Sequence, residues 1–544
     1  MLASDLLVEC LKKEGVEYIF GIPGEETLYL MESLRKKRMN FIPTRHEQGA
    51  AFMANVYGRL TGRPGVCLAT LGPGASNLLT GVADAYLDRA PLVAITAQAS
   101  LKNTHKESHQ YVDIVKMFQP ATKWNIRVER PEVIPEIVRK AFKIAQLEKP
   151  GSTHIEVPDD IAGVEATGSP LASNGIEYPL PNPDAIKRAA SIIKQAKNPI
   201  ILVGNGVTRR RAAAELKEFA ERLQIPVTNT FMGKGSIDYR NPLSLFTVGL
   251  QSRDWIMCGF DRADVVIAIG YDFVEYSPDK WNSNKDKKII HLDVVPSEID
   301  EFYIPEVEIT AEIRDSLKAL TALLKGKKKF KIYTALRETI LKELTEFKND
   351  NSFPMKPQKV VSDLRAALGL EDILISDVGA HKLWIARMFP THRPNTVLIS
   401  NGYAAMGIAL PGGIAAKLVH PERNVVVVAG DGGFLMTASE LETAKRLGLG
   451  IVIIVWVDNS YGLIEWKQKN QFGKAFGVYF KNPDFAKYAE SFGIKGFRVS
   501  NAKEFLPLLR QSLGSKEPVL IEIPIDYSEN LKLTEKLGHI ICPI

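Results

Sequence analysis

The sequence is poor in the features that mark several classes of protein. Only four of its 544 residues are cysteine (Cys10, Cys67, Cys258 and Cys542), and no two of them form a C-x-x-C pair, so a zinc site is not indicated. We expect these thiols to be buried or incidental. Apolar runs such as Ile451–Val457 are far shorter than the roughly 18–20 residues that a membrane span needs, so no transmembrane helix is expected.

Charge of one sign is not concentrated in the sequence either. Lysine and arginine number 69 and aspartate and glutamate 63, which gives a net charge of +6 with both signs mixed along the chain. This balance lacks the clustered basic footprint of a nucleic-acid-binding protein. The first apolar stretch is interrupted by Asp5, Glu9 and Glu14, unlike a secretory signal, so we expect a cytoplasmic protein. Apolar residues at 45% and charged residues at 24% favour a large multidomain enzyme.

The sequence does contain three blocks in which short apolar strands alternate with helices. The blocks span residues 1–165, 184–325 and 355–530, and a tail follows at 531–544. The alternation predicts an α/β fold with three doubly wound parallel sheets, each covered by helices on both faces. Gly163–Pro183, rich in Gly, Ser, Asn and Pro, is expected to be a linker. Lys325–Ile332 and the charged helix after it are expected to form a solvated connector.

The expected strands are short and rich in β-branched residues. They are Gly15–Phe20, Asn40–Thr44, Val66–Thr70 and Pro91–Thr96 in the first block, Pro199–Gly204, Val265–Ile269 and Ile289–Asp293 in the second, and Asn424–Ala429, Ile451–Val457 and Pro518–Ile523 in the third. The strands of the third block are continuously apolar, as buried parallel strands are.

A glycine-rich turn follows the strongest strand of the third block. Val425–Phe434 reads VVVVAGDGGF, so that a buried strand leads directly to Asp431 and a following helix. Ligands of open α/β sheets bind at the carboxyl ends of the strands, where glycines let backbone N–H groups approach an anion. Taken alone, this segment is also compatible with a simple strand-to-helix turn.

A second acid follows the next strand. Asp458, Asn459 and Ser460 come directly after Ile451–Val457, with Asp458 27 residues beyond Asp431. If the two strands are neighbours, their ends bring two oxygen-bearing side chains to one sheet edge. One or two carboxylates with phosphate oxygens suit Mg²⁺, so the pair predicts a site for a metal-bridged diphosphate.

This spacing resembles the thiamine diphosphate binding motif, GDG followed by about twenty-five residues and Asp or Asn. The resemblance implies that Asp431 and Asp458 bind Mg²⁺ through their side chains and Ser460 through its carbonyl. It also implies that Gly432 and Gly433 contact the diphosphate.

The first block supports the same interpretation. Arg45-His46-Glu47-Gln48 lies between an expected strand and an amphipathic helix, where a lone glutamate is usually a surface charge favoured by the helix dipole. The segment resembles the RHEQ/RHEG segment of thiamine diphosphate enzymes. There the glutamate hydrogen-bonds the aminopyrimidine ring and promotes activation of the cofactor, a task that suits a carboxyl group able to share one proton.

Longer motifs resemble one branch of these enzymes, the acetohydroxyacid synthases. The motifs are FGIPGEE (Phe20–Glu26), TLGPGASNL (Thr70–Leu78), DRAPLVAITAQ (Asp88–Gln98), HQYVD (His109–Asp113), SDVGAH (Ser376–His381) and ISNGYAAMGIALP (Ile399–Pro411). The resemblance extends over nearly the whole chain. It implies that Gln110 is a catalytic pocket residue beside Glu47. It further implies cofactor contacts from Gly24, Gly379, His381, Ala404 and Met406, with Met406 as the apolar wedge under the bent cofactor.

The middle block distinguishes two subtypes of this branch. Where FAD-dependent synthases carry a segment like ARFDDR, this chain has IGYDFVEYSPDKWN at Ile269–Asn282, which resembles the catabolic, FAD-independent type. Gly204-Asn205-Gly206 is a GxG turn without the full GxGxxG fingerprint, so we interpret it as structural, and FAD is not expected. The missing fingerprint also disfavours a nicotinamide dehydrogenase.

The resemblance implies that two pyruvate molecules are converted to 2-acetolactate and CO₂. It also implies a homodimer or homotetramer, because in this family the glutamate of one subunit faces the metal-bearing domain of another. None of the nine histidines is adjacent to another, whereas related decarboxylases commonly use a histidine pair to release aldehyde, and this favours carboligation.

Two other functions remain possible from the sequence alone. One is another thiamine diphosphate-dependent decarboxylase or carboligase, with a glyoxylate or aldehyde acceptor. The other is a non-catalytic diphosphate-binding protein, against which the intact Glu47, Asp431 and Asp458 argue. Glu25 and Lys467 depart from the synthase pattern, and Trp466 is expected either to line the acceptor pocket or to be an ordinary core residue. These positions put the physiological substrate in question more than the cofactor.

Overall fold

The structure is a computed structural model that describes residues 1–249, 254–324, 326 and 331–531. Its named strands form three sheets of six strands, and neighbouring strands within each sheet are parallel. The predicted α/β class with three doubly wound parallel sheets is therefore confirmed.

The first sheet has the strand order β2-β1-β3-β4-β6-β5. Its strands are β1 (Tyr18–Gly21), β2 (Asn40–Pro43), β3 (Gly65–Ala69), β4 (Leu92–Gln98), β5 (Trp124–Arg127) and β6 (Ser152–Pro158). The helices of this domain are α1 (Ala3–Lys13), α2 (Leu28–Lys36), α3 (Glu47–Thr61), α4 (Pro73–Leu87), α5 (Ile114–Phe118), α6 (Ile134–Gln146) and α7 (Asp159–Ala162). Side chains alternate along the strands, so Ile19 packs into the core under α1 and α6 while Phe20 packs under α3 and α4.

The middle sheet has the order β12-β11-β10-β7-β8-β9. Its strands are β7 (Pro199–Val203), β8 (Val227–Asn229), β9 (Ser244–Thr247), β10 (Val265–Ile269), β11 (Lys288–Asp293) and β12 (Pro305–Thr310). The helices are α8 (Pro183–Gln195), α9 (Asn205–Arg209), α10 (Ala213–Leu223), α11 (Trp255–Arg262), α12 (Ile313–Leu323) and α13 (Lys331–Thr345). The expectation of a solvated connector is wrong for α13, because its Tyr333, Leu336 and Ile340 are buried in the core of this domain.

The third sheet repeats the pattern with the order β14-β13-β15-β16-β18-β17. Its strands are β13 (Ile373–Ser376), β14 (Val397–Ile399), β15 (Val425–Gly430), β16 (Ile451–Val457), β17 (Lys495–Arg498) and β18 (Val519–Pro524). The helices are α14 (Pro357–Ala367), α15 (Ala380–Met388), α16 (Ala409–Val419), α17 (Asp431–Thr437), α18 (Leu441–Arg446), α19 (Gly462–Phe472), α20 (Phe485–Ser491) and α21 (Ala502–Leu513).

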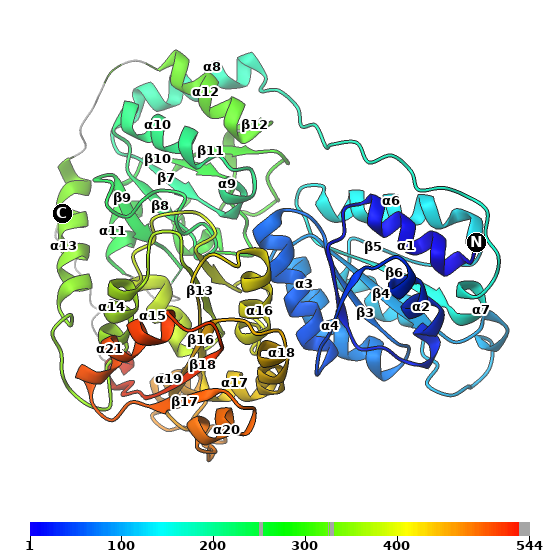
Figure 1. Cartoon of the computed structure of the whole chain (residues 1–544). Coiled ribbons are helices and arrows are strands. Elements are labelled where there is room, and N and C mark those ends of the chain that lie inside the picture. Colours follow the sequence, from blue (N-terminus) through cyan, green and yellow to red (C-terminus); the bar gives the residue numbers. More distant parts are fainter. Residues whose placement is uncertain (250–253, 325, 327–330, 532–544) are drawn as a thin grey trace.

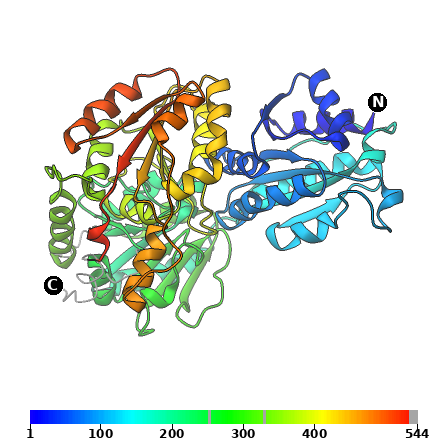
Figure 2. The ribbon, with the colours of Figure 1, turned by 90° about the horizontal axis from the view of Figure 1, so that it is seen from below.

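The three domains are arranged unequally in space. Figures 1 and 2 show the first domain as a lobe beside the other two, while the middle and third domains pack against each other. The lobe is attached through α3, which packs on α16, and one apolar core runs from the first sheet through both helices to the third. The predicted linker is visible in Figure 1 as the long connection to α8, with no helix or strand at 166–182.

Several further expectations can be compared with this structure. Cys10 and Cys67 are buried thiols, as expected; Cys258 is instead disulfide-bonded. Cys542 and nearly all of the predicted tail lie outside the described residues. Within the described ranges, no helix combines the length and apolar character needed to cross a membrane.

Candidate active site

A buried carboxylate and a partly buried one meet at the carboxyl edge of the third sheet. β15 and β16 are parallel neighbours, with Gly430 opposite Trp456, so Asp431 and Asp458 leave adjacent strands at the same level. Oδ2 of Asp431 accepts hydrogen bonds from the backbone N–H groups of Asp458 (3.1 Å) and Asn459 (2.7 Å). The expectation that these two acids lie at one sheet edge is therefore confirmed.

The electrostatics of this pair favour a bound cation. Burial raises the pKa of Asp431, and burial followed by the neighbouring Asp431 charge raises the pKa of Asp458 to about 7. Two carboxylates in one buried place repel each other unless a proton or a cation lies between them. No group of three or more His, Cys, Asp or Glu suited to a metal occurs among the described residues. A bound ion would therefore need carbonyl, water or phosphate oxygens as well, which is usual for Mg²⁺.

A cavity of about 180 Å³ opens beside these carboxylates. It is lined by nine of the residues predicted from the sequence: Gly379, His381, Ala404, Met406, Asp431, Gly432, Gly433, Asp458 and Ser460. A Cβ atom on Gly432 would lie 2.9 Å from the Tyr461 ring, so only glycine leaves the backbone open to the cavity. Nε2 of His381 is buried and has no partner among the described residues. The lining thus fits an anionic group such as a diphosphate.

The loop that carries Ala404 and Met406 is held from two sides. Ala404 has φ +59°, a left-handed conformation that is unfavourable for a residue with a side chain. On one side, the buried carboxylate of Asp377 accepts a hydrogen bond from Gly407 N (2.8 Å). On the other, Oδ1 of Asp84 in α4 of the first domain accepts from Ala405 N (3.1 Å). The first domain therefore helps to shape the cavity without lining it.

Glu47 lies at the first turn of α3, directly after β2, as predicted. His46 caps this helix through its Nδ1, which accepts from Gln48 N at 3.1 Å. The Glu47 side chain is 8% exposed, and its Oε2 accepts a hydrogen bond from Nδ2 of Asn77 (3.0 Å). No hydrogen bond reaches its Oε1 from the described residues, so one carboxylate oxygen remains available to a ligand.

A buried acid of the third domain fixes the turn before Glu47. Glu440, fully buried after α17, accepts hydrogen bonds at Oε1 from Arg45 N (3.0 Å) and His46 N (3.1 Å). Its Oε2 accepts from the Thr443 hydroxyl at 2.6 Å. The entry to α3 is therefore positioned by the third domain of the same chain.

Gly24 and Gln110 lie near the turn at residues 70–74, in the same domain as Glu47. A Cβ on Gly24 would lie 2.4 Å from Cβ of Thr70, and one on Gly72 would lie 2.6 Å from the Gln110 carbonyl oxygen. These residues all follow strands of the first sheet at its carboxyl edge. None of the residues lining the 180 Å³ cavity comes from the first domain. A single chain thus presents two separate half-sites.

Three residues of the half-sites were not identified from the sequence. Asn482 donates hydrogen bonds from Nδ2 to Asp431 (2.7 Å) and to Oδ1 of Asn459 (3.0 Å). Glu440 positions the turn before α3, and Asp377 positions the loop at Gly407. Asn482 lies in a loop that folds back on residues 459–461, and no sequence motif marks it. Asp377 lies within the SDVGAH motif (Ser376–His381), although its positioning role was not predicted, and no motif marks Glu440.

The residues that depart from the synthase pattern lie at different depths. Glu25 is exposed at the start of a short 3₁₀ turn, and Lys467 is exposed on α19. Trp466 is partly buried against the core of the third domain and does not line the cavity.

Comparison with known proteins agrees with this division of the chain. Three families match: "Thiamine pyrophosphate enzyme, N-terminal TPP binding domain" at residues 1–117, "Thiamine pyrophosphate enzyme, central domain" at 186–320, and "Thiamine pyrophosphate enzyme, C-terminal TPP binding domain" at 377–523. The "Acetolactate synthase" of Bacillus subtilis is 37% identical over 97% of this chain and 94% of its own length. The "Acetolactate synthase, catabolic" of Raoultella terrigena is 36% identical over 98% and 97%. A "Probable acetolactate synthase large subunit" of Methanocaldococcus jannaschii is 35% identical over 100% and 96%.

Proposed function

Because the chain belongs to the thiamine pyrophosphate enzyme family, with acetolactate synthases among its full-length relatives, we propose that it is an acetolactate synthase that needs no FAD. It joins two pyruvate molecules to give 2-acetolactate and CO₂. The observation that carries the proposal is the cavity in which the Asp431–Asp458 pair and the glycine cradle lie together.

We assign the residues of this cavity to the diphosphate end of the cofactor. Asp431, Asp458 and the Ser460 carbonyl hold Mg²⁺, and the backbone of Gly432 and Gly433 binds the diphosphate. His381 offers its unpartnered Nε2 to an anion and stays neutral, since burial lowers its pKa to about 3. When bound, thiamine diphosphate supplies the electron sink for decarboxylation of a 2-oxoacid.

The first-domain residues handle the proton at the other end of the cofactor. Glu47 holds a proton at its unoccupied Oε1 and returns it, while Asn77 fixes the other carboxylate oxygen. Gln110, beside the turn at residues 70–74, binds and orients substrate. Gln110 has a positive φ (56°), and its backbone carbonyl lies against Gly72 of that turn.

Independence from FAD is supported by how the middle domain fills its own crevice. Ligands of doubly wound sheets bind at the carboxyl ends of the strands, here next to Gly204-Asn205-Gly206. A Cβ on Gly204 would lie 2.3 Å from the Gly270 carbonyl oxygen, and Asn205 N donates to the carboxylate of Glu275 at 2.9 Å. The chain's own segment after β10 thus occupies the place where a dinucleotide would meet the glycine turn.

A homo-oligomer is supported by the separation of the half-sites. Large apolar side chains are exposed around the cavity and on α19, although a monomer gains nothing from exposing them together. They are Leu435, Met436, Tyr461, Ile464, Phe472, Phe476 and Tyr479. We propose that the first domain of a second copy covers this region and brings its Glu47 to the cavity, in a dimer or a tetramer.

The test is an assay with pyruvate, thiamine diphosphate and Mg²⁺, without FAD, in which products are identified by mass. We expect CO₂ and 2-acetolactate in equal amounts. Acetaldehyde without acetolactate would contradict the proposal and indicate a decarboxylase. Absence of CO₂ release from pyruvate or any other 2-oxoacid would indicate a non-catalytic protein.

A further inference from the structure

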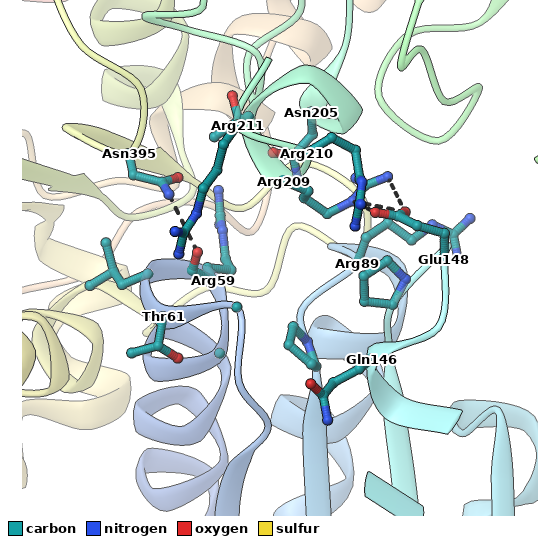
Figure 3. A pocket seen from close by; sticks show the side chains of 16 residues that line it. Arg59, Thr61, Arg89, Gln146, Glu148, Asn205, Arg209, Arg210, Arg211 and Asn395 are labelled. Carbon is teal, nitrogen blue, oxygen red and sulfur yellow. Dashed lines mark hydrogen bonds and ion pairs between the residues drawn. The ribbon is translucent and has the colours of Figure 1, made fainter. Parts of the chain in front are cut away.

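A second cavity lies where all three domains meet, and its lining is rich in arginine. The cavity encloses about 120 Å³ and shares no residue with the one at Asp431. Five arginines and one glutamate line it: Arg59, Arg89, Arg209, Arg210, Arg211 and Glu148. Figure 3 shows these side chains converging from the end of α3, from the residues after α4 and α6, and from α9 and the turn after it. We call this space the junction pocket.

Most of these arginines already have a carboxylate partner. Four ion pairs account for them: Arg59 with Asp88 (3.4 Å), Arg89 with Asp272 (2.8 Å), Arg209 with Glu148 (2.9 Å), and Arg210 with Glu312. The fifth arginine, Arg211, has no carboxylate partner among the described residues. Its guanidinium makes no hydrogen bond or ion pair with any residue that the structure describes. The junction pocket therefore carries positive charge that the surrounding residues do not neutralise.

The conformation of Arg211 directs this charge into the junction pocket. Arg211 follows α9 with φ +52°, and its backbone N–H donates to the Thr208 carbonyl (3.1 Å), which closes the turn. In Figure 3 its side chain extends toward Arg59 and Asn395, and all three residues line the junction pocket. Holding positive charges close together costs free energy, and an anion bound between them removes this cost.

A second arginine of the lining, Arg209, also has an unused donor. Arg209 is largely buried and binds Glu148 through Nε (3.2 Å) and Nη2 (2.9 Å). Its Nη1 is buried without a hydrogen-bond partner among the described residues. Leaving a buried charged donor unsatisfied is expensive, and such groups in folded proteins normally have a bound water or ion.

We propose that the junction pocket binds a small phosphate-bearing anion, with Arg211 as its principal donor. A phosphate group matches guanidinium donors because its oxygens accept two parallel N–H bonds and its charge is up to two. The junction pocket has room for such a group. Its volume is about 120 Å³, whereas one water molecule needs only about 10–15 Å³ on the same measure. Inorganic phosphate and a phosphate monoester share this chemistry.

Occupation of the junction pocket would connect the three domains. Arg59 belongs to α3 of the first domain and donates to the Ile399 carbonyl of the third (3.1 Å), while Arg209 and Arg211 belong to the middle domain. A ligand that binds only the folded, assembled arrangement stabilises it by mass action. This inference concerns a site separate from the proposed reaction and holds whichever 2-oxoacid the enzyme uses.

The test measures phosphate binding to the full chain, with thiamine diphosphate and Mg²⁺ saturating so that the diphosphate site is filled. Calorimetric titration with inorganic phosphate, at ionic strength held constant with NaCl, is compared for wild type, Arg211→Gln and Arg188→Gln. Arg211 and Arg188 are both exposed arginines of the middle domain, and Arg188, on α8, lies outside the junction pocket. Wild type and Arg188→Gln are expected to bind one phosphate per chain, and Arg211→Gln at least tenfold more weakly.

Two further arms complete this test. Arg211→Lys keeps the charge but not the two parallel N–H donors, so it is expected to bind phosphate more weakly than wild type and more tightly than Arg211→Gln, an order that a loss through misfolding would not give. Titration with phenyl phosphate separates the two sources, because tighter binding than inorganic phosphate identifies an organic phosphate as the ligand, and weaker binding identifies the free ion. Equal affinity of Arg211→Gln and wild type, or no binding by wild type beyond the NaCl control, would overturn the proposal.

Discussion

Two buried glutamates near the start of α3 have different surroundings, and these define different tasks. Glu440 has both oxygens engaged, by Arg45 N, His46 N and the Thr443 hydroxyl. Glu47 has one oxygen engaged by Asn77 and one without a partner in the described chain. A carboxylate with satisfied oxygens can only position its neighbours, whereas one with a free oxygen can exchange a proton with a ligand.

Replacing Glu47 by glutamine is expected to abolish most activity and leave the fold intact. The amide has nearly the same shape but cannot take up and return a proton, a function worth roughly 10²–10⁴-fold in rate. We expect at least a hundredfold lower acetolactate formation at saturating cofactor and an unchanged melting temperature. Glu132→Gln, at an exposed position of the same domain, is the matched control. A Glu47→Gln enzyme with full activity would remove Glu47 from the mechanism.

Glu440 is expected to act through the position of Glu47. In Glu440→Ala, two partly buried backbone N–H groups lose their acceptor, which costs about 0.5–1.5 kcal/mol for each hydrogen bond and frees the turn before Glu47. We expect kcat to fall about tenfold or more with little change in the affinity for thiamine diphosphate, measured by fluorescence titration. Glu440→Gln keeps a carbonyl oxygen in place and should recover part of kcat. Equal kcat values for the alanine variant and wild type would show that the turn needs no such support.

At this scale the sequence predicts acids that follow strongly apolar strands, as Asp431 and Asp458 do. Strand ends have a defined place in a parallel sheet, so a side chain one residue beyond them is located almost as well as the strand itself. Asn482 could not be found this way, because it reaches Asp431 from a loop whose path depends on tertiary contacts.

Among the elements, several buried strands and the edge strand β2 were predicted closely, whereas the edge strands β5 and β17 and the buried strands β6 and β13 were missed. Val265–Ile269 and Ile451–Val457 have the predicted bounds, because both strands are apolar throughout and covered on both faces. β5 and β17 were not predicted. They have four residues each, lie at sheet edges and are only partly buried, so they lack an apolar run that distinguishes them from loops.

The segment between β10 and β11 gives the middle domain a defined dependence on pH. Burial raises the pKa of Glu275, which accepts hydrogen bonds from Asn205 N and the Thr230 hydroxyl, to about 7. The unfolded chain releases this proton near pH 4.5 and the folded chain near 7, so the folded state holds more protons between these values. Glu275 therefore costs stability as pH rises through this window, by about 3 kcal/mol in total at roughly 1.4 kcal/mol per pH unit.

Thermal unfolding of wild type and Glu275→Gln at pH 5 and pH 8 measures this effect. Glutamine carries no charge to desolvate, so we expect the variant to gain stability relative to wild type on going from pH 5 to pH 8. Other buried acids titrate in both proteins and cancel in the difference. Glu218→Gln, at an exposed position on α10, should show no such gain. A difference between wild type and Glu275→Gln that is the same at both pH values would contradict the assignment.

For the whole molecule, the two half-sites of one chain predict complementation between inactive variants. If the active site forms between subunits, a hybrid of a Glu47→Gln chain with an Asp431→Asn chain contains one site with both defects and one with neither. Each hybrid dimer then keeps one of its two sites, so hybrids isolated from the homodimers are expected to have about half of the wild-type activity per chain. Co-expression of the two variants with different affinity tags, purification through both tags and an acetolactate assay test this.

The matching control is a double variant that carries both changes in one chain, mixed with wild type. Its hybrid dimers have two sites with one defect each, so the hybrids should be inactive. If each chain instead formed its own complete site, the hybrid of single variants would stay inactive, and the hybrid with the double variant would keep half of the wild-type rate.

The connection between the first and middle domains has a consequence for how the polypeptide could be divided. Residues 166–182 form no helix or strand, a Cβ on Gly175 would meet nothing within 4 Å, and residues 171–175 are exposed. The first domain is held instead by the core shared by α3 and α16 and by the contacts of Glu440 and Asp84. An intact peptide chain at Gly175 therefore adds little to the association of the first domain with the rest of the protein, beyond raising the local concentration of the two parts. Two separately translated pieces, residues 1–175 and 176–544, are therefore expected to associate and form the same structure.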